Sequence, residues 1–174
     1  MRQSSKESKF DPVKIHIIIT LVVMVFIFVH SAMPGDVSGS ESRFFAEILS
    51  SITGISFQVA HFIVRKAAHF TEFAILGACL SVNFNDYKSQ NALIKADKAP
   101  AKQVIWTHPL IAAWITGTLY ACTDEFHQLF VEGRSGEIRD VCIDSAGVIL
   151  GIAIAAIVKT IKKRILSDRR GTIC

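Results

Sequence analysis

The chain has few cysteines, and none of them stands in a metal-binding or disulfide pattern. Its 174 residues include four cysteines, at positions 79, 122, 142 and 174, with no CxxC pair and far below the density of a disulfide-rich fold. Three of the four lie inside apolar runs, where cysteine usually behaves as a small hydrophobic residue. We therefore expect neither a disulfide nor a cysteine-ligated zinc site.

Basic stripes with interleaved aromatic residues are also absent. The formal net charge of +4 is modest and unevenly distributed along the chain, and no recognisable nucleic-acid-binding module occurs. These observations exclude nucleic acid as the expected partner. The uneven distribution of the charges indicates membrane topology and not nucleic-acid binding.

Apolar residues are in excess and make up 51% of the sequence. This content is too high for an average soluble domain, and several runs approach the ~20 residues that cross a bilayer. The predicted fold class is all-α, a polytopic membrane protein with a bundle of four transmembrane helices plus an interfacial or re-entrant helix. The predicted spans are residues 13–30, 66–82, 109–130 and 138–158.

The first of these runs is predicted to be an uncleaved span. It is apolar on nearly every face, whereas a helix of a soluble bundle would show a polar stripe. A basic start followed by an apolar middle also fits a signal peptide, but the residues after it offer no clean A-x-A cleavage site.

Lysine and arginine are unevenly shared among the segments that flank the spans. They are frequent in residues 1–12, 83–108 and 159–174 and sparse in residues 31–65. The positive-inside rule therefore predicts that both termini are cytoplasmic, that 83–108 is a solvated cytoplasmic linker and that 31–65 is extracytoplasmic.

Residues 42–65 are apolar, with serine, glutamine and histidine interleaved, and are less uniformly apolar than the spans. We expect an amphipathic helix on the outer surface, or a short re-entrant element, that acts as an interfacial lid. A fifth crossing would invert the charge bias of every later loop.

Ionisable side chains lie within or at the rims of the last three predicted spans, where a charge must be paired or face a polar cavity. Helical spacing places them on one face of each helix, and the predicted topology brings all three clusters together in the outer half of the bundle. Gly147 and Gly151 form a small-xxx-small pair that lets a neighbouring helix approach closely. The clusters are Lys66, His69 and Glu72; Asp124, Glu125, His127 and Gln128; and Asp140 and Asp144, with Arg134 able to fold back toward them from the turn.

The expected cavity contains more acids than bases, and close carboxylates in a low dielectric cannot all stay ionised. The surplus can hold a proton, a divalent metal or the cationic part of a substrate. His69 and Glu72 are spaced to ligate a metal together with Asp124 or His127. Because no HExxH motif occurs, the prediction includes no metal and no other cofactor.

Three ordered stretches resemble the VanZ-like family of bacterial membrane proteins: KAAHFTEFAILG, YACTDEFHQLFVEGRSGEIRDVCIDSAGVILG and VHSAMPG. The resemblance extends from about Val13 to Val158 and departs from the family pattern at Glu132, where a proline is expected. It implies a protein of the bacterial inner membrane with an outward-facing polar site and a link to resistance against the glycopeptide teicoplanin. The matched residues are Lys66, His69, Glu72, Leu76, Asp124, Glu125, His127, Gln128, Gly133, Arg134, Asp140, Asp144, Gly147 and Gly151.

Three classes of function fit these residues. The first is an enzyme acting on a lipid-linked or cell-wall substrate at the outer leaflet, with His69 or His127 as the general base. The second is a non-catalytic binder of an envelope component, such as a peptidoglycan precursor or a glycopeptide. The third is a structural bundle whose polar cluster is an ion-pair network that fixes helix packing.

The expected partners are membrane lipids and either a lipid-linked cell-wall precursor or a glycopeptide, while catalysis and the oligomeric state stay open. His30, His61 and His108 lie at span boundaries and are expected to be interfacial. The candidate catalytic residues are His69, Glu72, Asp124, Glu125, His127, Asp140 and Asp144, and the candidate substrate-binding residues are Lys66, Gln128 and Arg134.

Overall fold

The computed structural model describes residues 11–95 and 108–171, and these residues are helical apart from short connections. The all-α class predicted from the sequence is confirmed for this part of the chain. The helices are α1 (Pro12–Ser31), α2 (Gly35–Thr53), α3 (Phe57–Lys95), α4 (Pro109–Gln128) and α5 (Ile138–Gly171).

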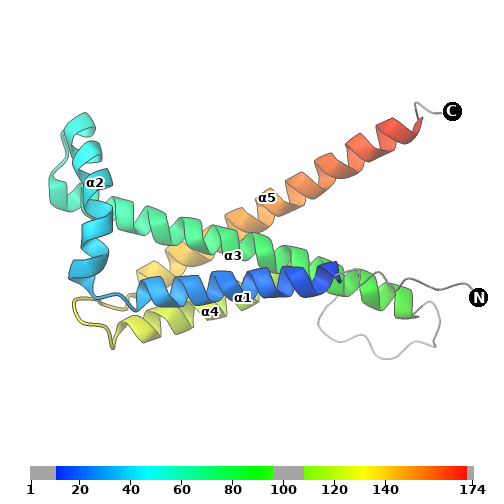
Figure 1. Ribbon diagram of the computed structural model, residues 1–174, viewed down its shortest axis with the longest axis horizontal. Helices are drawn as coiled ribbons and strands as arrows, with labels where there is room; N and C mark the ends of the chain where they lie inside the picture. Colours follow the sequence, from blue (N-terminus) through cyan, green and yellow to red (C-terminus); the bar gives the residue numbers. More distant parts are fainter. Residues whose placement is uncertain (1–10, 96–107, 172–174) are drawn as a thin grey trace, which may run out of the picture.

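Helix α3 is central and contacts each of the other four helices. Helices α1 and α4 lie alongside it, α5 crosses it and then diverges, and α2 stands at an angle at one end (Figure 1). The start of α1 and the end of α5 lie at the other end, away from α2 and from the connection between α4 and α5 (Figure 1). One end of the molecule therefore carries α2, and the opposite end carries the first turns of α1 and the last turns of α5.

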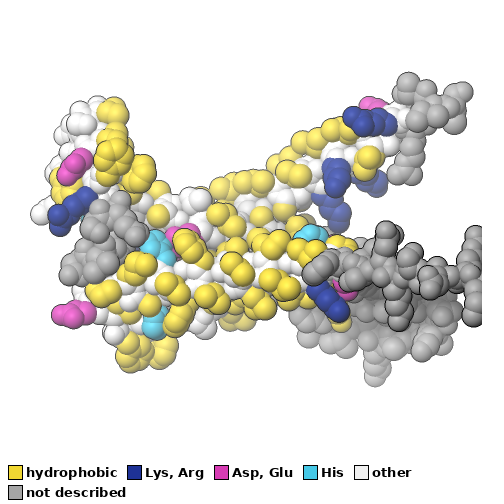
Figure 2. All heavy atoms as spheres, viewed as in Figure 1, with side chains coloured by type: hydrophobic (Ala, Val, Ile, Leu, Met, Phe, Trp, Pro, Cys, Tyr) yellow, Lys and Arg dark blue, Asp and Glu magenta, His cyan; other side chains and the backbone are white. Residues whose placement is uncertain are grey.

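Three helical segments are long and apolar enough to cross a membrane: α1, residues 57–89 of α3 and residues 138–169 of α5. Their apolar surface is largely uncovered, and Ile18 and Val22 of α1 are 59% and 62% exposed. Figure 2 shows hydrophobic side chains over much of α1 and α5, with lysine and arginine at the start of α1 and along the last turns of α5. Outward-facing apolar surface of this extent is expected of a protein that lies in lipid.

Helix α4 is not among these three segments, so the predicted count of four spans is not confirmed. Its 20 residues are enough to cross a bilayer by length, but its last turns carry Asp124 and Glu125, and Gly117 and Thr118 interrupt its apolar middle. The helix packs against both α3 and α5.

The observed helices differ from three predicted segments. Residues 42–65, expected to form one interfacial or re-entrant element, are divided between α2 and α3, because Gly54 adopts a left-handed φ of 73° and ends α2. The predicted linker at 83–108 is helical as far as Lys95, and its residues 96–107 lie outside the described residues. The predicted tail at 159–174 continues α5 to Gly171, since no proline or interior glycine interrupts it.

The close approach predicted for Gly147 and Gly151 is confirmed, and the neighbour is α3. A Cβ atom on Gly147 would lie 2.5 Å from the carbonyl oxygen of Phe70, which is too close for a real side chain. A Cβ atom on Gly151 would overlap the carbonyl group of Ala74. Glycine at both positions therefore allows α5 to cross directly over α3.

Helices α1 and α3 run antiparallel (Figure 1) and are joined by two histidine–carboxylate pairs. The Nδ1 atom of His16 lies 2.7 Å from Asp86 Oδ2, and that of His30 lies 2.7 Å from Glu72 Oε1. On both helices the partners are fourteen residues apart (16 to 30 and 72 to 86), a rise of ~21 Å along a helix. The two pairs together fix the register of α1 on α3.

Candidate functional site

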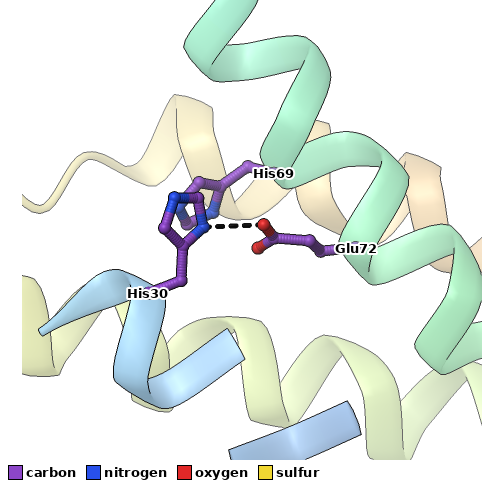
Figure 3. A group of neighbouring side chains, drawn as sticks. All are labelled: His30, His69 and Glu72. Carbon is purple, nitrogen blue, oxygen red and sulfur yellow. Dashed lines mark hydrogen bonds and ion pairs between the residues drawn. The ribbon is translucent and has the colours of Figure 1, made fainter. Parts of the chain in front are cut away.

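Four helices contribute to one cluster of acids and histidines, made up of His30 from α1, His69 and Glu72 from α3, Asp124 from α4 and Asp144 from α5. We call it the His/Asp/Glu cluster. Figure 3 shows its outer part, in which Glu72 Oε1 lies 2.7 Å from His30 Nδ1 and the rings of His30 and His69 stack with centroids 5.9 Å apart. One candidate ligand atom from each of His30, His69 and Glu72 lies within 4.8 Å of the other two.

The inner part of the cluster is formed by His69, Asp124 and Asp144, whose candidate ligand atoms also lie within 4.8 Å of one another. The two aspartates are 2% and 1% exposed, and His69 Nδ1 is 3.8 Å from Asp144 Oδ2. Asp124 Oδ2 accepts hydrogen bonds from Ser31 Oγ at 2.8 Å and from Gln128 Nε2 at 3.0 Å. Asp124 therefore ties the end of α1 to α4.

Each carboxylate of the cluster keeps one buried oxygen without a hydrogen-bond partner within the described residues: Glu72 Oε2, Asp124 Oδ1 and Asp144 Oδ2. Buried polar atoms in folded proteins are nearly always hydrogen-bonded, because desolvating them without a partner is costly. These oxygens are therefore acceptors with capacity left for a proton, a metal ion or a donor on a ligand.

Lys66 and Asp140 form an ion pair at the edge of the cluster. Arg139 Nε lies 3.7 Å from the other carboxylate oxygen of Asp140. Asp140 lies in the first turn of α5, where the helix dipole favours a negative charge. Lys66 was a candidate for substrate binding and Asp140 for catalysis, and in the structure these two residues join α3 to α5.

Glu125 and Gln128 hold the connection between α4 and α5. The backbone N–H of Glu137 donates to Glu125 Oε2 at 3.0 Å, and Gln128 Nε2 lies 3.4 Å from Glu125 Oε1. His127 lies outside the His/Asp/Glu cluster, and its ring stacks on Phe28 of α1 with centroids 4.5 Å apart. The catalytic roles suggested for Glu125 and His127 stay predictions.

Arg134 was expected to fold back onto the carboxylates, but its hydrogen bonds go to the main chain. Its Nε donates to the carbonyl of Met33 at 2.9 Å and its Nη2 to that of His30 at 3.0 Å. Carbonyl groups at the end of a helix have no partner within the helix, so Arg134 caps α1. Burial, followed by the like charge of Arg65, lowers the pKa of Arg134, although an arginine stays protonated.

A cavity of about 170 Å³ lies beside the cluster and is lined by both of its histidines. Arg65 and Arg134 also line the cavity, so two arginines and two histidines border one small space. The complete lining is His30, Ser42, Phe45, Val64, Arg65, Ala68, His69 and Arg134.

A model of the VanZ/LLP1 family matches residues 16–159, a range that includes every residue of the cluster and of the cavity. The chain belongs to the VanZ/LLP1 family. This match confirms the resemblance carried by the sequence motifs. No curated protein and no solved structure matches the chain.

Sequence reasoning missed three contributors to the site of this VanZ/LLP1 protein. His30 was expected to be interfacial, but its side chain is 19% exposed and paired with Glu72. Ser31 was not singled out, and Arg65 counted only as a charge between spans. His30 and Ser31 belong to VHSAMPG, one of the stretches that carry the family resemblance, and that stretch was the available signal.

Proposed function

We propose that this VanZ/LLP1 protein binds the phosphate-bearing headgroup of a lipid-linked cell-envelope component at the outer face of the bacterial inner membrane. The observation that carries the proposal is the cavity that Arg65 and Arg134 share beside the cluster. Arg134 is held in place by the carbonyls of His30, in α1, and of Met33, just after α1. Arg65 forms no hydrogen bond or ion pair within the part of the chain that the structure describes.

Arg65 and Arg134 carry like charges beside one cavity, and the charge of Arg65 is a secondary cause, after burial, of the lowered pKa of Arg134. An anion between them relieves the repulsion of these like charges and accepts charge-assisted hydrogen bonds, for which phosphate has the matching geometry. The imidazoles of His30 and His69 supply further donors on the same wall.

The size of the cavity favours one polar group of a larger ligand. Sites that enclose a whole small molecule usually measure about 300–1,000 Å³, whereas this cavity measures about 170 Å³. Apolar surface for a hydrocarbon chain lies next to it on α2, where Phe44 is 64% exposed and Phe45, which also lines the cavity, is 61% exposed. A lipid with a phosphorylated headgroup could place its headgroup in the cavity and its hydrocarbon chain on the apolar surface of α2.

The outward orientation in this proposal rests on the distribution of basic residues. The last turns of α5 are rich in lysine and arginine and lie at the end of the molecule opposite α2 (Figures 1 and 2). The positive-inside rule assigns that end to the cytoplasm, with both termini on that side. The cavity, which α2 helps to line, then faces outward, and α4 crosses the membrane as the fourth span.

A binding assay with two lipids tests the proposal on the purified full-length protein in lipid nanodiscs. A fluorescent polyprenyl diphosphate is expected to bind, and the matching polyprenyl alcohol is not. Arg65→Gln is expected to weaken diphosphate binding roughly tenfold, the effect of one lost charged hydrogen bond. Arg43→Gln, at an exposed position of α2, is the matched control and should leave binding unchanged.

Equal binding of the alcohol, or an unchanged affinity in Arg65→Gln, would contradict the proposal. Following the bound diphosphate over time also separates binding from turnover, since an enzyme would release a dephosphorylated or transferred product.

The proposal extends to glycopeptide resistance, which the family assignment suggests. Expression of the chain in a susceptible bacterium should raise the inhibitory concentration of teicoplanin, and Asp144→Asn should remove this effect at unchanged protein abundance. An increase that persists in Asp144→Asn would separate resistance from the cluster.

A structural network is the second candidate function, and specific contacts favour it. The Lys66–Asp140 pair, the Arg134 cap and the Glu125–Glu137 hydrogen bond each join two elements of the fold. If this candidate is correct, neutralising Asp144 lowers protein abundance and Arg65→Gln has no effect on lipid binding.

A further inference from the structure

We propose that His30, His69 and Glu72 bind a divalent transition-metal ion of the zinc type, with Asp144 and Asp124 as the adjacent acidic donors. This proposal is independent of headgroup binding, because the two arginines of the cavity need no metal to attract an anion.

The donor set suits zinc. Two imidazoles and one carboxylate are a frequent ligand set of catalytic zinc sites, which leave the fourth position open. The three candidate atoms come from two helices and already lie within 4.8 Å of one another. Bonds of about 2.0–2.2 Å to zinc place tetrahedral donors about 3.4 Å from each other. Zinc would therefore replace the 2.7 Å hydrogen bond between His30 and Glu72, and side-chain rotations would bring the three donors to the required spacing.

An independent observation comes from the other two helices. Asp144 Oδ2 and Asp124 Oδ1 belong to side chains that are 1% and 2% exposed, and neither atom has a hydrogen-bond partner within the described residues. The Asp144 oxygen without a hydrogen bond lies 3.8 Å from His69 Nδ1, within ion-pair distance of that ring. Asp124 and Asp144 thus form a second candidate group with His69, the residue that also belongs to the proposed site of His30, His69 and Glu72.

The charge of the region also calls for a cation. Three carboxylates meet in the cluster, and neither Lys66 nor Arg134 bonds to them, because Lys66 is paired with Asp140 and Arg134 donates to main-chain carbonyls. A divalent ion would offset the charge of several close carboxylates at once.

The cavity gives such an ion an entry path and an open position. His30 and His69 are both ligands in the proposal and both line the cavity, so an ion between them can be reached from it. A structural zinc site is closed by four protein ligands, whereas a site reached from a cavity resembles the open class.

Metal content of the full-length protein in detergent micelles tests the inference. The protein is stripped with a chelator, incubated with ZnCl₂, desalted and measured by elemental analysis, with thermal unfolding followed in parallel. We expect about one equivalent of zinc and a higher melting temperature of the loaded protein, since an ion that binds only the folded state stabilises it. Cobalt(II) in place of zinc should give the intense visible absorption of a tetrahedral site.

The variants His30→Asn, His69→Asn and Glu72→Gln should each lower zinc affinity by roughly tenfold or more. His16→Asn is the matched control, because His16 makes the same 2.7 Å contact with a carboxylate but has no third donor in any candidate metal group of the described residues. It should retain the full equivalent. Helical circular dichroism and elution volume establish whether each variant is folded. If a histidine variant does not fold, Glu72→Gln still tests the site, because it preserves the shape of the side chain.

Less than about a tenth of an equivalent of any transition metal after reloading would overturn the inference, as would full zinc content in the folded Glu72→Gln variant. Either result leaves the headgroup proposal standing if metal-free protein still binds polyprenyl diphosphate in a manner that depends on Arg65. Zinc binding without lipid binding would leave the metal site and remove the other proposal.

Discussion

The His16–Asp86 and His30–Glu72 pairs join the same two helices at the same distance of 2.7 Å, yet their surroundings differ. The side chains of the first pair are 39% and 32% exposed and those of the second 19% and 12% exposed. Near the first pair lie the neutral side chains of Thr20 and Asn83, which hydrogen-bond to each other. The second pair adjoins the other members of the His/Asp/Glu cluster and the arginine-lined cavity.

This difference shows that a histidine–carboxylate contact does not by itself mark a site. Both pairs hold α1 against α3. Cavities adjoin both pairs, since His16 and Asp86 also line cavities. Within the described residues, only the His30–Glu72 pair has additional buried acidic donors on two further helices and carboxylate oxygens without a hydrogen bond. An ion or a ligand requires such donors, and both proposals therefore concern the end of the bundle that carries the His30–Glu72 pair.

The largest expected contrast is in accessibility from outside the cell. Ser135, next to the cavity residue Arg134, and Ser89, in the turn after Asp86, are both exposed positions that accept a cysteine. In a background without other cysteines, a membrane-impermeant maleimide on intact cells should label Ser135→Cys and not Ser89→Cys. The reverse pattern would place the His/Asp/Glu cluster on the cytoplasmic side and remove the proposed ligand class.

The next largest effect is expected where α5 crosses α3. Gly151→Leu places a side chain where the carbonyl of Ala74 already lies, so α5 must move and Asp144 with it. We expect a destabilisation of about 3 kcal/mol or more and loss of zinc binding. The His16–Asp86 contact, which does not involve α5, should survive. Thermal unfolding in detergent and zinc content measure the two effects, and a variant with wild-type values would contradict the crossing geometry.

A smaller difference in stability is expected between variants that remove the hydroxyl groups of Ser31 and Thr20, which lie beside the two histidine–carboxylate pairs. Ser31→Ala removes a donor from the buried carboxylate of Asp124, and about 1–3 kcal/mol of stability should be lost. Thr20→Ala removes a hydroxyl that accepts from the neutral amide of Asn83 and donates to the His16 carbonyl, for which about 1 kcal/mol is expected. Denaturant or thermal unfolding of both variants provides the comparison, and equal losses would show that the charge of Asp124 does not matter.

The smallest effect is expected at the exposed pair itself. His16→Asn should cost no more than about 1 kcal/mol, since an ion pair that is a third exposed is largely screened by solvent. Its zinc content and its lipid binding should match the wild type. A larger loss of stability would mean that the first pair contributes more to packing than its exposure indicates.

The sequence predicted individual helices and their polar faces well. Spacing within one helix placed His69 and Glu72 together, and the structure keeps them together in the cluster. Helical periodicity does not show which residue of another helix faces that stripe, and for this reason His30 was missed. The same limit applies to Asp140, whose place on the polar stripe of α5 did not reveal that its side chain pairs with Lys66.

Helix ends were harder to predict than helix faces. Hydropathy marks where lipid-compatible residues stop, but a helix continues into polar sequence as long as nothing breaks it, as α3 does to Lys95 and α5 to Gly171. The break at Gly54 depends on a left-handed backbone conformation. A single glycine in an apolar stretch does not by itself predict that conformation. The count of spans has the same weakness, because α4 is long enough to cross but only moderately apolar.

The equal fourteen-residue interval on α1 and α3 has a mechanical consequence. If α1 slid along α3 by one turn, both pairs would break in the same step, and no neighbouring position of the helix would restore either of them. The height of the His30 imidazole in the membrane is therefore set in part by a contact ~21 Å away at the opposite end of the helix. Any movement that opens the cavity must come from α2 or from the turn that carries Arg134, while α1 stays in place.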